Sequence, residues 1–464
     1  MSEYDYDLIV VGTGPAGQKA AVQGSKVGKR VAIVERRQTV GGVCINTGTI
    51  PSKTMREAVL YLSGYRERNI YGASYRVKER ITMTDLNFRC NHVIRHEIDV
   101  IRHQMMRNQI DLLEGTASFE DPHTIKISHQ SGDRNATAGV VVIAVGTKPT
   151  KGANIPFSTD RIFTSDGVLD MKEVPKTLVV VGAGVIGLEY ASIFAALGVR
   201  VTIVDMRPRL LDFVDDEIID ALTYHLRSYR VTVRLGESVE EMEFDEKEDK
   251  VVTHLKSGKR IISQKALYSI GRTGVTAELN LEAADLKADS RGRLPVDENF
   301  RTDVKHIYAV GDVIGFPSLA STSMEQGRLA SAHAFSVETD SFPDLFPFGI
   351  YTIPEISMVG KHEEELTEEG IPYEVGKAHF KEISRGQIIG DELGMLKLIF
   401  GLEDRKLLGV HIIGEGATEL VHIGQAVLAF GGKIDYFVYT VFNYPTLAEA
   451  YKVAALDGIN RLSL

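Results

Sequence analysis

One short segment of the chain, GGVCINTGTIPSK (residues 41–53), combines residue types that could take part in redox chemistry. Cys44 supplies a thiol, but Thr49 stands where a disulfide partner could be expected. The other cysteine, Cys90, lies in NFRCNHVIRHEI, within a stretch (about 85–112) whose pattern predicts a long amphipathic helix. The segment is therefore a redox-type loop with one thiol and no resolving partner.

The elements around this loop are indicated by one pattern that occurs twice. DLIVVGTGPAGQKAAVQGSKVGKRVAIVE (7–35) reads as an apolar strand, a glycine-rich turn, a helix, a second strand and an acid. TLVVVGAGVIGLEYASIFAALGVRVTIVD (177–205) repeats this order, and the acid follows the first glycine at the same spacing. The glycines and acids are Gly12, Gly14, Gly17 and Glu35, then Gly182, Gly184, Gly187 and Asp205.

This spacing is typical of dinucleotide-binding units. The first glycine makes a tight turn, the second lets the backbone approach a pyrophosphate, and the third lets the helix pack on the strand. Backbone N–H groups at the helix N-terminus then bind the phosphate charge. The acid can accept hydrogen bonds from a ribose. Two complete copies predict two dinucleotide sites in one chain.

Three later segments extend the pattern. VVIAVG (141–146) and LYSIGR (267–272) each read as an apolar strand that ends near a glycine, one late in each repeat. HIYAVGDVIGFPSLASTSMEQG (306–327) reads as a strand, a turn at Gly311 and Asp312, and a helix that begins near Ser318. Asp312 would lie at a strand end, where ligands of open α/β sheets bind, which favours a ligand-binding role over that of a turn residue.

Composition excludes several classes of protein. The chain has 464 residues, 44% hydrophobic and 25% charged, which is ordinary for a globular protein of two or three domains. The net charge of −10 argues against nucleic-acid binding. No apolar run is long enough for a membrane span, and the N-terminus has no basic signal-peptide region. The two cysteines fit a reducing cytoplasm.

Two further stretches have clear local patterns. Residues 56–112 read as mostly helical, and the charge-rich segment EEMEFDEKEDKVV (240–252) predicts a solvated hairpin inside the second repeat's domain. No metal-ligand cluster is evident, because the 13 histidines are scattered along the chain.

The series of motifs resembles that of the flavoprotein pyridine nucleotide–disulfide oxidoreductases. The resemblance covers nearly the whole chain and rests on GTGPAG with Glu35, GGVCINTGTIPSK, AVGT, GAGVIG with Asp205, SIGR, YAVGD, IYTIPEIS (350–357) and NYPTLAEAY (443–451). It implies an α/β fold with two Rossmann-like domains, the first for FAD and the second for NAD(P), and a C-terminal α+β dimerisation domain. The implied ranges are 1–150 and 272–342 for FAD, 151–271 for NAD(P) and 343–464 for a homodimer or higher homo-oligomer interface.

The resemblance also implies roles for particular residues. Glu35 matches the acid on the adenosine ribose of FAD, and Asp312 the acid on the flavin's ribityl chain. Lys53 matches a catalytic lysine near flavin N5, and Glu189 matches its catalytic carboxylate partner; such a cation stabilises the negative charge of reduced flavin. The implied cofactor-binding residues are Gly12, Gly14, Gly17, Glu35, Arg36, Gly42, Cys44, Thr49, Lys53, Gly115, Ala117, Ala144, Gly146, Gly182, Gly184, Gly187, Asp205, Arg207, Arg209, Gly271, Arg272, Gly311, Asp312, Leu319 and Ala320.

The chain departs from the disulfide reductases of this family at two places. Thr49 replaces the flavin-side cysteine of their CxxxxC pair. In NYPTLAEAY, Tyr444 stands where they have a histidine base, while Glu449 remains. A phenol with a pKa near 10 is a poor base at pH 7. Both losses remove thiol–disulfide exchange and leave hydride transfer between FAD and nicotinamides.

The combination of these departures with intact cofactor motifs is similar to the soluble pyridine nucleotide transhydrogenases of the family, of the Si-specific type. The implied reaction is NADPH + NAD⁺ ⇌ NADP⁺ + NADH, with FAD as the bound cofactor and the two nicotinamides exchanging in one pocket. Two alternatives stay open: another NAD(P)H-dependent flavin oxidoreductase with a quinone, dye or oxygen acceptor, and a flavin-bound subunit with little turnover of its own.

The end of the second repeat, VTIVDMRPRLLDF, bears on cofactor choice. Asp205 can accept a hydrogen bond from a free 2′-hydroxyl, which favours NAD(H), and Arg207 and Arg209 can pair with a 2′-phosphate, which favours NADP(H). The sequence predicts use of both dinucleotides; the alternative is an NAD-only site with two surface arginines. Cys44 is expected to be a structural remnant, with a regulatory thiol role as the alternative.

Overall fold

The computed structural model describes residues 3–157 and 160–462. Its described residues divide into two compact units, each built from three stretches of chain. The first unit contains Met1–Thr54, Asn87–Thr150 and Ile270–Phe342, and the second contains Met55–Leu86, Lys151–Ser269 and Pro343–Leu464. The division into three domains expected from the sequence stays a prediction.

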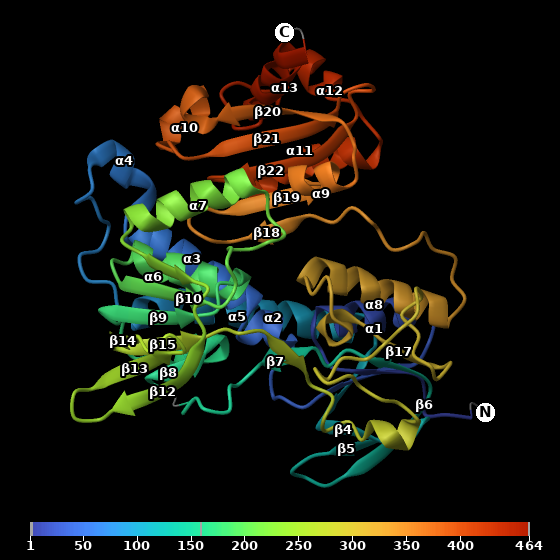
Figure 1. The fold of residues 1–464 in the computed structure, drawn as a ribbon. Helices are drawn as coiled ribbons and strands as arrows, with labels where there is room; N and C mark the ends of the chain where they lie inside the picture. The colour runs from blue at the N-terminus through green and yellow to red at the C-terminus, as the bar shows by residue number, and fades with distance from the viewer. Residues whose placement is uncertain (1–2, 158–159, 463–464) are drawn as a thin grey trace. The chain divides into compact units, whose positions relative to one another are not determined.

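The first unit is built on a mostly parallel sheet in the order β3-β2-β1-β6-β5-β4, with β17 also paired to β6 (Figure 1). β1 pairs in parallel with both β2 and β6, which is the strand order of a dinucleotide-binding fold. The strands are β1 (Tyr6–Val11), β2 (Val31–Glu35), β3 (Asp111–Glu114), β4 (Thr116–Asp121), β5 (Thr124–Ser128), β6 (Arg134–Ile143) and β17 (Ile307–Ala309), with a separate ribbon of β7 (Thr147–Pro149) and β16 (Arg272–Gly274).

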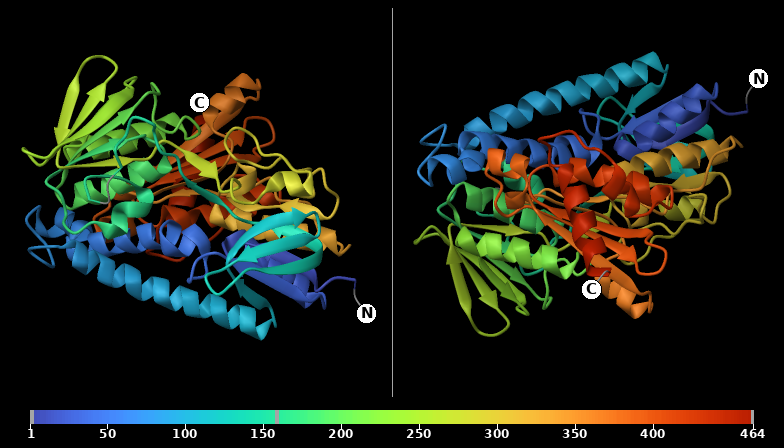
Figure 2. Two further views of the ribbon diagram at one scale, coloured as in Figure 1. Left: turned by 90° about the horizontal axis from the view of Figure 1, so that it is seen from below. Right: turned by 90° about the horizontal axis from the view of Figure 1, so that it is seen from above.

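Helices α1 (Pro15–Lys26) and α8 (Ala320–Ala334) pack side by side in this unit (Figure 1). The backbones approach closely, because a Cβ added to Gly327 would collide with the carbonyl oxygen of Ala16. Helix α2 (Gly42–Asn46) also lies in this unit, while α3 (Thr49–Leu62) and α5 (Met83–Arg107) each begin in one unit and end in the other. Figure 2 shows α5 as one long, uninterrupted helix.

The second unit contains a parallel sheet in the order β11-β10-β9-β15-β8, which repeats the arrangement around β1. Its strands β8 (Ile162–Thr164), β9 (Thr177–Val181), β10 (Arg200–Asp205), β11 (Thr232–Leu235) and β15 (Lys265–Tyr268) are joined by α6 (Val185–Ala196) and α7 (Asp216–Ser228). A small antiparallel sheet follows the order β12 (Val239–Asp245), β13 (Lys250–Leu255) and β14 (Arg260–Ser263). Helix α4 (Arg68–Tyr71) belongs to the same unit.

The C-terminal part of the second unit is an antiparallel sheet in the order β18-β19-β22-β21-β20. Its strands are β18 (Phe348–Ile350), β19 (Ile356–Gly360), β20 (Tyr373–His379), β21 (Met395–Gly401) and β22 (Leu407–Ile413). The surrounding helices are α9 (Glu363–Glu368), α10 (Ser384–Ile389), α11 (Ala417–Ala429), α12 (Asp435–Tyr439) and α13 (Glu449–Leu462). An apolar core that includes Phe380, Phe400 and Tyr451 joins the sheet to its helices. The α/β fold class is therefore confirmed.

Most local predictions agree with the structure, and four need correction. The hairpin at 240–252 is confirmed by β12 and β13. The helix expected at 85–112 ends at Arg107, because Asp111–Glu114 pairs with β2 as β3. Ser318 precedes α8 and has a left-handed φ of 52°, so the helix starts at Ala320. The turn at Gly311 is a 3₁₀ helix, Gly311–Ile314.

The fourth correction concerns the segment 41–53. It is not a loop: α2 contains Cys44, and α3 begins at Thr49, with only Thr47 and Gly48 between them. Asn46 stabilises the first of these helices by donating hydrogen bonds from its side chain to the carbonyls of Val40 and Gly42. A helical backbone with few alternative conformations therefore holds Cys44, Thr49 and Lys53.

Candidate active site

The β1–α1 turn has the three glycine functions expected of a phosphate-binding turn. Gly12 has a φ of 106°, and a Cβ there would lie 2.5 Å from the carbonyl oxygen of Ala144. A Cβ on Gly17 would collide with the carbonyl oxygen of Gly12, so this glycine lets α1 pack on the turn. A Cβ on Gly14 would meet nothing within 4 Å. The backbone at Gly14 thus borders open space in the described chain, where a phosphate can approach the start of α1.

The β9–α6 turn repeats this arrangement. Gly182 has a φ of 100°, and its Cβ would lie 2.7 Å from the carbonyl oxygen of Ser269. A Cβ on Gly187 would collide with Gly182, whereas one on Gly184 would meet nothing within 4 Å. Both turns therefore have the tight first turn, the open second position and the close helix contact that a dinucleotide requires.

The acid that ends the second strand is held in the same way in both copies. Glu35 accepts hydrogen bonds from the N–H (3.2 Å) and hydroxyl of Thr13 and from the N–H of Arg37 (3.0 Å). Asp205 accepts them from the N–H of Ala183 (2.6 Å) and of Arg207 (2.8 Å). These donors fix each carboxylate at the edge of its glycine turn. The role of Thr13 was missed from the sequence, although the residue lies within the first glycine pattern.

Asp205 also pairs with the side chain of Arg207. The guanidinium donates from Nε (3.1 Å) and Nη2 (2.9 Å) to the carboxylate. Burial works to raise the pKa of Asp205, but the hydrogen bonds from Arg207 and Ala183 outweigh it and the pKa is lowered. The site thus presents an ionised carboxylate beside a cation. Arg209 lies elsewhere and pairs with Asp216.

Cys44 and Thr49 face one another across the break between α2 and α3. Burial, the largest effect, raises the pKa of the Cys44 thiol, and a hydrogen bond with the Thr49 hydroxyl only partly opposes it. Cys90 donates a long hydrogen bond (3.5 Å) to the carbonyl of Pro51, and burial raises its pKa to about 11. Both cysteines are free. A raised pKa disfavours the regulatory thiolate role considered for Cys44.

Lys53 follows on α3 and is half-buried. Its Nζ lies 3.4 Å from Ser52 Oγ. The expected partner, Glu189, is 3% exposed on α6 and accepts a hydrogen bond from the N–H of Tyr351 (2.9 Å). Ser192, one turn later, accepts from the N–H of Ile353 (3.0 Å), so α6 holds the segment before β19. The pairing of Lys53 with Glu189 stays a prediction.

Asp312 lies in the 3₁₀ helix after β17, next to the ribbon of β7 and β16. Thr147 donates its hydroxyl to Asp312 (3.2 Å), and Arg272 donates to the hydroxyl (2.7 Å) and carbonyl (2.8 Å) of Thr147. The N–H of Gly311 donates to Gln326 on α8 (2.9 Å). Residues from three distant stretches therefore meet at one strand end. Thr147 ends the AVGT motif, but its contacts with Asp312 and Arg272 were not predicted from the sequence.

The remaining predicted residues of the first unit lie around these elements. Backbone N–H groups of Ala144 and Gly115 donate to the carbonyls of Val11 (2.8 Å) and Glu35 (2.9 Å). Ala117 is buried, and Arg36 pairs with Glu278 (3.3 Å).

The other predicted residues of this unit lie at turns and helix ends. A Cβ on Gly42 would lie 2.9 Å from Gly14 Cα, and Leu319 caps α8 before Ala320. Gly146 and Gly271 accept backbone bonds from Val275 and Thr150 beside the β7–β16 ribbon.

Tyr444, at the expected position of the catalytic base, has a different hydrogen-bond partner. It is 70% exposed, and its hydroxyl lies 2.6 Å from Ser384 Oγ. Within the described residues, Oε2 of Glu449 is buried without a hydrogen-bond partner. A phenol paired with a serine does not remove a proton from a thiol at neutral pH.

Two family models and several named relatives match this chain over most of its length. A family model described as pyridine nucleotide-disulphide oxidoreductase matches residues 6–327, and its dimerisation-domain model matches residues 346–455. The chain is 56% identical to the soluble pyridine nucleotide transhydrogenase of Mycobacterium tuberculosis strain H37Ra, over 99% of this chain and 98% of that protein. It is 47% identical to the one from Azotobacter vinelandii, over 100% of both chains.

Solved structures of the same architecture include an HOCl-induced flavoprotein disulfide reductase, RclA, from Escherichia coli. That chain superposes with a TM-score of 0.88 at 26% identity, and the match covers 97% of this chain and 99% of RclA. Among the described residues, no helix is both long and apolar enough to cross a membrane.

Proposed function

Because the chain belongs to the pyridine nucleotide-disulphide oxidoreductase family, we propose that it is a transhydrogenase that moves hydride between NADPH and NAD⁺ through bound FAD. One observation carries the proposal: two complete dinucleotide turns stand in a chain whose Cys44 faces a threonine hydroxyl. The residues expected to bind the cofactors are present, while Thr49 and Tyr444 stand where disulfide exchange would need a cysteine and a histidine. Two relatives named soluble pyridine nucleotide transhydrogenase match 99% and 100% of this chain.

The residues of the first unit fit FAD. The open position at Gly14 offers room for a pyrophosphate, and Glu35, held by Thr13 and Arg37, faces the ribose end of such a site. Asp312, Leu319 and Ala320 would hold the flavin end, where the N-terminus of α8 favours negative charge. Gly184 and Asp205 would hold a nicotinamide dinucleotide in the second unit.

Bound FAD would supply the acceptor and donor of hydride. The chain's own contribution is to bind one dinucleotide at a time at Gly184 and Asp205, release it, and bind the other, in a ping-pong sequence. Lys53 would place a positive charge at the reacting edge of the flavin, and Glu189 would balance that charge. No residue has to move a proton to or from sulfur, which agrees with Tyr444 in place of a base. We infer the Si-specific type from the same resemblance.

Use of both dinucleotides is supported by the Asp205–Arg207 pair. A free 2′-hydroxyl can donate to Asp205, and a 2′-phosphate can accept from Arg207 while the pair persists. Repulsion between Asp205 and a phosphate at 4 Å is about 4 kcal/mol per unit charge at an effective dielectric of 20. A hydrogen bond from Arg207 to the phosphate returns about 1.5–3 kcal/mol, and one from Arg209 would return as much once Arg209 leaves Asp216, so both forms can bind.

Two further properties belong to the proposal. The match of the dimerisation-domain model supports a homodimer or a higher homo-oligomer. Free thiols at Cys44 and Cys90 support the cytoplasm as its compartment, because reduced cysteines persist there.

The test is anaerobic hydride transfer from NADPH to thio-NAD⁺ by the purified yellow protein, with lipoamide as a parallel acceptor. We expect rapid reduction of thio-NAD⁺ and none of lipoamide. If NADPH bleaches the flavin but thio-NAD⁺ is not reduced, the proposal is wrong, and quinones, dyes and oxygen become the acceptors to examine. If NADPH does not reduce the flavin at all, a subunit without turnover is the better description.

Removal of the Cys44 thiol is expected to leave hydride transfer intact. The Cys44→Ala variant should keep the kcat of the unchanged enzyme, because the thiol is neutral and has no second sulfur to exchange with. Stopped-flow rates of flavin reduction and reoxidation test this. Thr49→Cys is the counterpart: it should form a disulfide with Cys44, detected by thiol titration, without gaining lipoamide reduction. A large loss of kcat in Cys44→Ala would contradict the prediction.

A further inference from the structure

Arg207 pairs with Asp205 at the second dinucleotide turn, but Arg209 does not. Its guanidinium pairs with Asp216, the first residue of α7. Glu364 is also close: burial works to raise the pKa of Glu364, but hydrogen bonds and the charges of His362 and Arg209 leave it lowered. Asp216 and Glu364 therefore interact with Arg209, whereas Asp205 pairs with Arg207.

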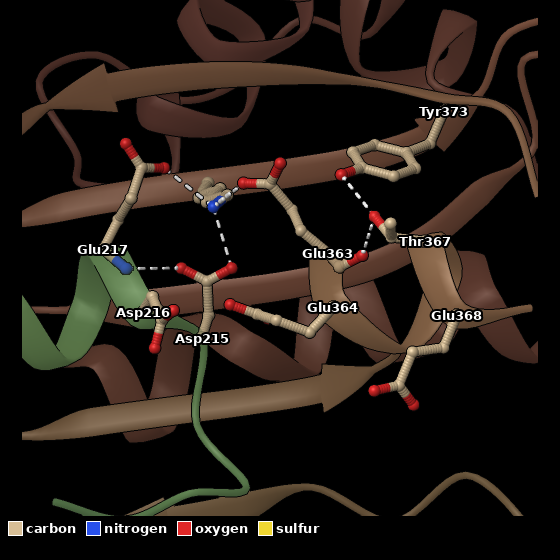
Figure 3. Close-up of a pocket in the computed structure, with 9 residues that line it drawn as sticks. Asp215, Asp216, Glu217, Glu363, Glu364, Thr367, Glu368 and Tyr373 are labelled. Atoms are coloured by element: carbon tan, nitrogen blue, oxygen red, sulfur yellow. Dashed lines mark hydrogen bonds and ion pairs between the residues drawn. The ribbon is translucent and has the colours of Figure 1, made fainter. Parts of the chain in front are cut away.

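These carboxylates belong to an acidic pocket of about 450 Å³ in the second unit (Figure 3). Asp215, Glu217 and Glu363 all pair with Lys397, and the close-up shows these three carboxylates pointing toward one another. The pocket is lined by Asp215, Asp216, Glu217, Glu363, Glu364, Thr367, Glu368, Tyr373 and Lys397.

The first turn of α7 is fixed on both sides of Asp216. Asp215 caps the helix by accepting from the N–H of Glu217 (3.1 Å), and its other oxygen lies 2.7 Å from Lys397 Nζ. The Lys397 side chain is 1% exposed and also pairs with Glu217 (2.7 Å) and Glu363. Because β21 holds Lys397, the ion pairs anchor residues 215–217, and Asp216 holds Arg209 from a rigid position.

The segment between Asp205 and α7 is fixed as well. Leu210, Leu211 and Val214 are buried, and the carbonyl of Arg207 accepts from the N–H of Gly236 (3.0 Å). Two residues of chain span at most about 7 Å. The backbone of Arg209 therefore lies near that of Arg207. Its long side chain can leave Asp216 and reach a phosphate that is bound beside Arg207.

We propose that Asp216 is a specificity-determining residue, which competes with the 2′-phosphate of NADP(H) for the Arg209 guanidinium. The inference rests on the proposed function, because it requires that Arg209 reads the 2′-phosphate. Asp216 acts through Arg209 and is a positioning residue. Binding of NAD(H) needs no such exchange and leaves the Arg209–Asp216 pair in place, so Asp216 weakens NADP(H) binding without affecting NAD(H).

Removal of the charge at Asp216 gives a measurable change in selectivity. Half-exposed ion pairs contribute modestly, so Asp216→Asn should tighten NADP⁺ binding by about two- to fivefold. The dissociation constant for NAD⁺ and the kcat should not change. The fold should persist, because Asp216 is half-exposed and Asp215 remains as the cap.

The experiment is calorimetric titration of the FAD-loaded enzyme with NADP⁺ and with NAD⁺, together with KM values for NADPH and NADH. Glu368→Gln is the matched control, because it removes a charge from the lining of the same pocket, whereas the ion pair of Arg209 is with Asp216. Arg209→Ala and the double variant complete the cycle, and Asp216→Asn should have no effect when Arg209 is absent.

Each outcome decides the inference. Tighter binding of NADP⁺ alone in Asp216→Asn, and not in Glu368→Gln, supports it. An equal change for both dinucleotides, an equal change in Glu368→Gln, or no change overturns it. If Arg209→Ala leaves NADP⁺ binding unaltered, the proposed role of Arg209 fails first. Lack of transfer to thio-NAD⁺ concerns only the proposed function, since the binding constants are measured without turnover.

Discussion

Gly14→Val is expected to abolish FAD retention, and Gly184→Val to abolish dinucleotide binding while the protein stays yellow. Both positions have extended backbones, with φ of −65° and −76°, that valine can adopt. Neither Cβ would meet an atom of the described chain within 4 Å. The added side chain therefore projects into the space proposed for the pyrophosphate. A clash of about 3 kcal/mol lowers affinity by roughly 100-fold or more.

The measurement is the flavin absorbance per chain after purification, followed by calorimetric titration with NADP⁺. Circular dichroism verifies that both variants fold. Gly17→Ala and Gly187→Ala are informative controls, because their Cβ atoms would collide with the backbone of Gly12 and Gly182 and should lower the melting temperature. Retention of FAD by a folded Gly14→Val protein would contradict the assignment of the first turn.

Lys53→Met is expected to lower the rate of flavin reduction by NADPH by about 10²–10³-fold, as loss of a preorganised electrostatic contact does. The half-buried Lys53 stands at the start of α3, beside Cys44 and Thr49, and methionine keeps most of its length. Binding of FAD and NADP⁺ should persist, because the glycine turns and acids are untouched. Only the charge near the reacting atoms is lost.

Stopped-flow absorbance of the flavin measures this rate, and the reduction potential of the bound flavin should become more negative. Lys26→Met, which removes an exposed lysine from the last turn of α1, is the control and should leave both quantities unchanged. Glu189→Gln should show a smaller decrease in rate. An unchanged potential in Lys53→Met would exclude the proposed role, even if the rate fell.

Much of the candidate site is readable from local sequence because its requirements are local. A tight turn at Gly12 and a close helix contact at Gly17 admit only glycine, and the strand that ends at Glu35 is a run of apolar residues. The same short-range constraints operate at Gly182, Gly187 and Asp205. The sequence also shows directly that Thr49 and Tyr444 stand where the disulfide reductases have a cysteine and a histidine. Each change removes a reactive side chain from a motif that is otherwise kept.

Other features depend on residues far apart in the chain. Thr147 connects Asp312 to Arg272, and Tyr351 donates its N–H to Glu189, yet no spacing indicates either contact. The helical form of residues 42–46 was also missed, because glycine and asparagine favour turns. In each case hydrogen bonds or packing from another segment decide the conformation or the partner.

The sequence by itself determined the two dinucleotide turns, the acids that end their second strands and the loss of the dithiol, because backbone sterics and residue chemistry act over a few neighbouring positions. Only the tertiary structure decided the separation of Arg207 from Arg209. Both arginines lie in one short stretch, but Asp205 holds the first, and Asp216 holds the second from a helix turn that Lys397 anchors. An ion pair forms between charged groups that lie close together in space, and the pairing of strands and packing of helices decide which groups do so.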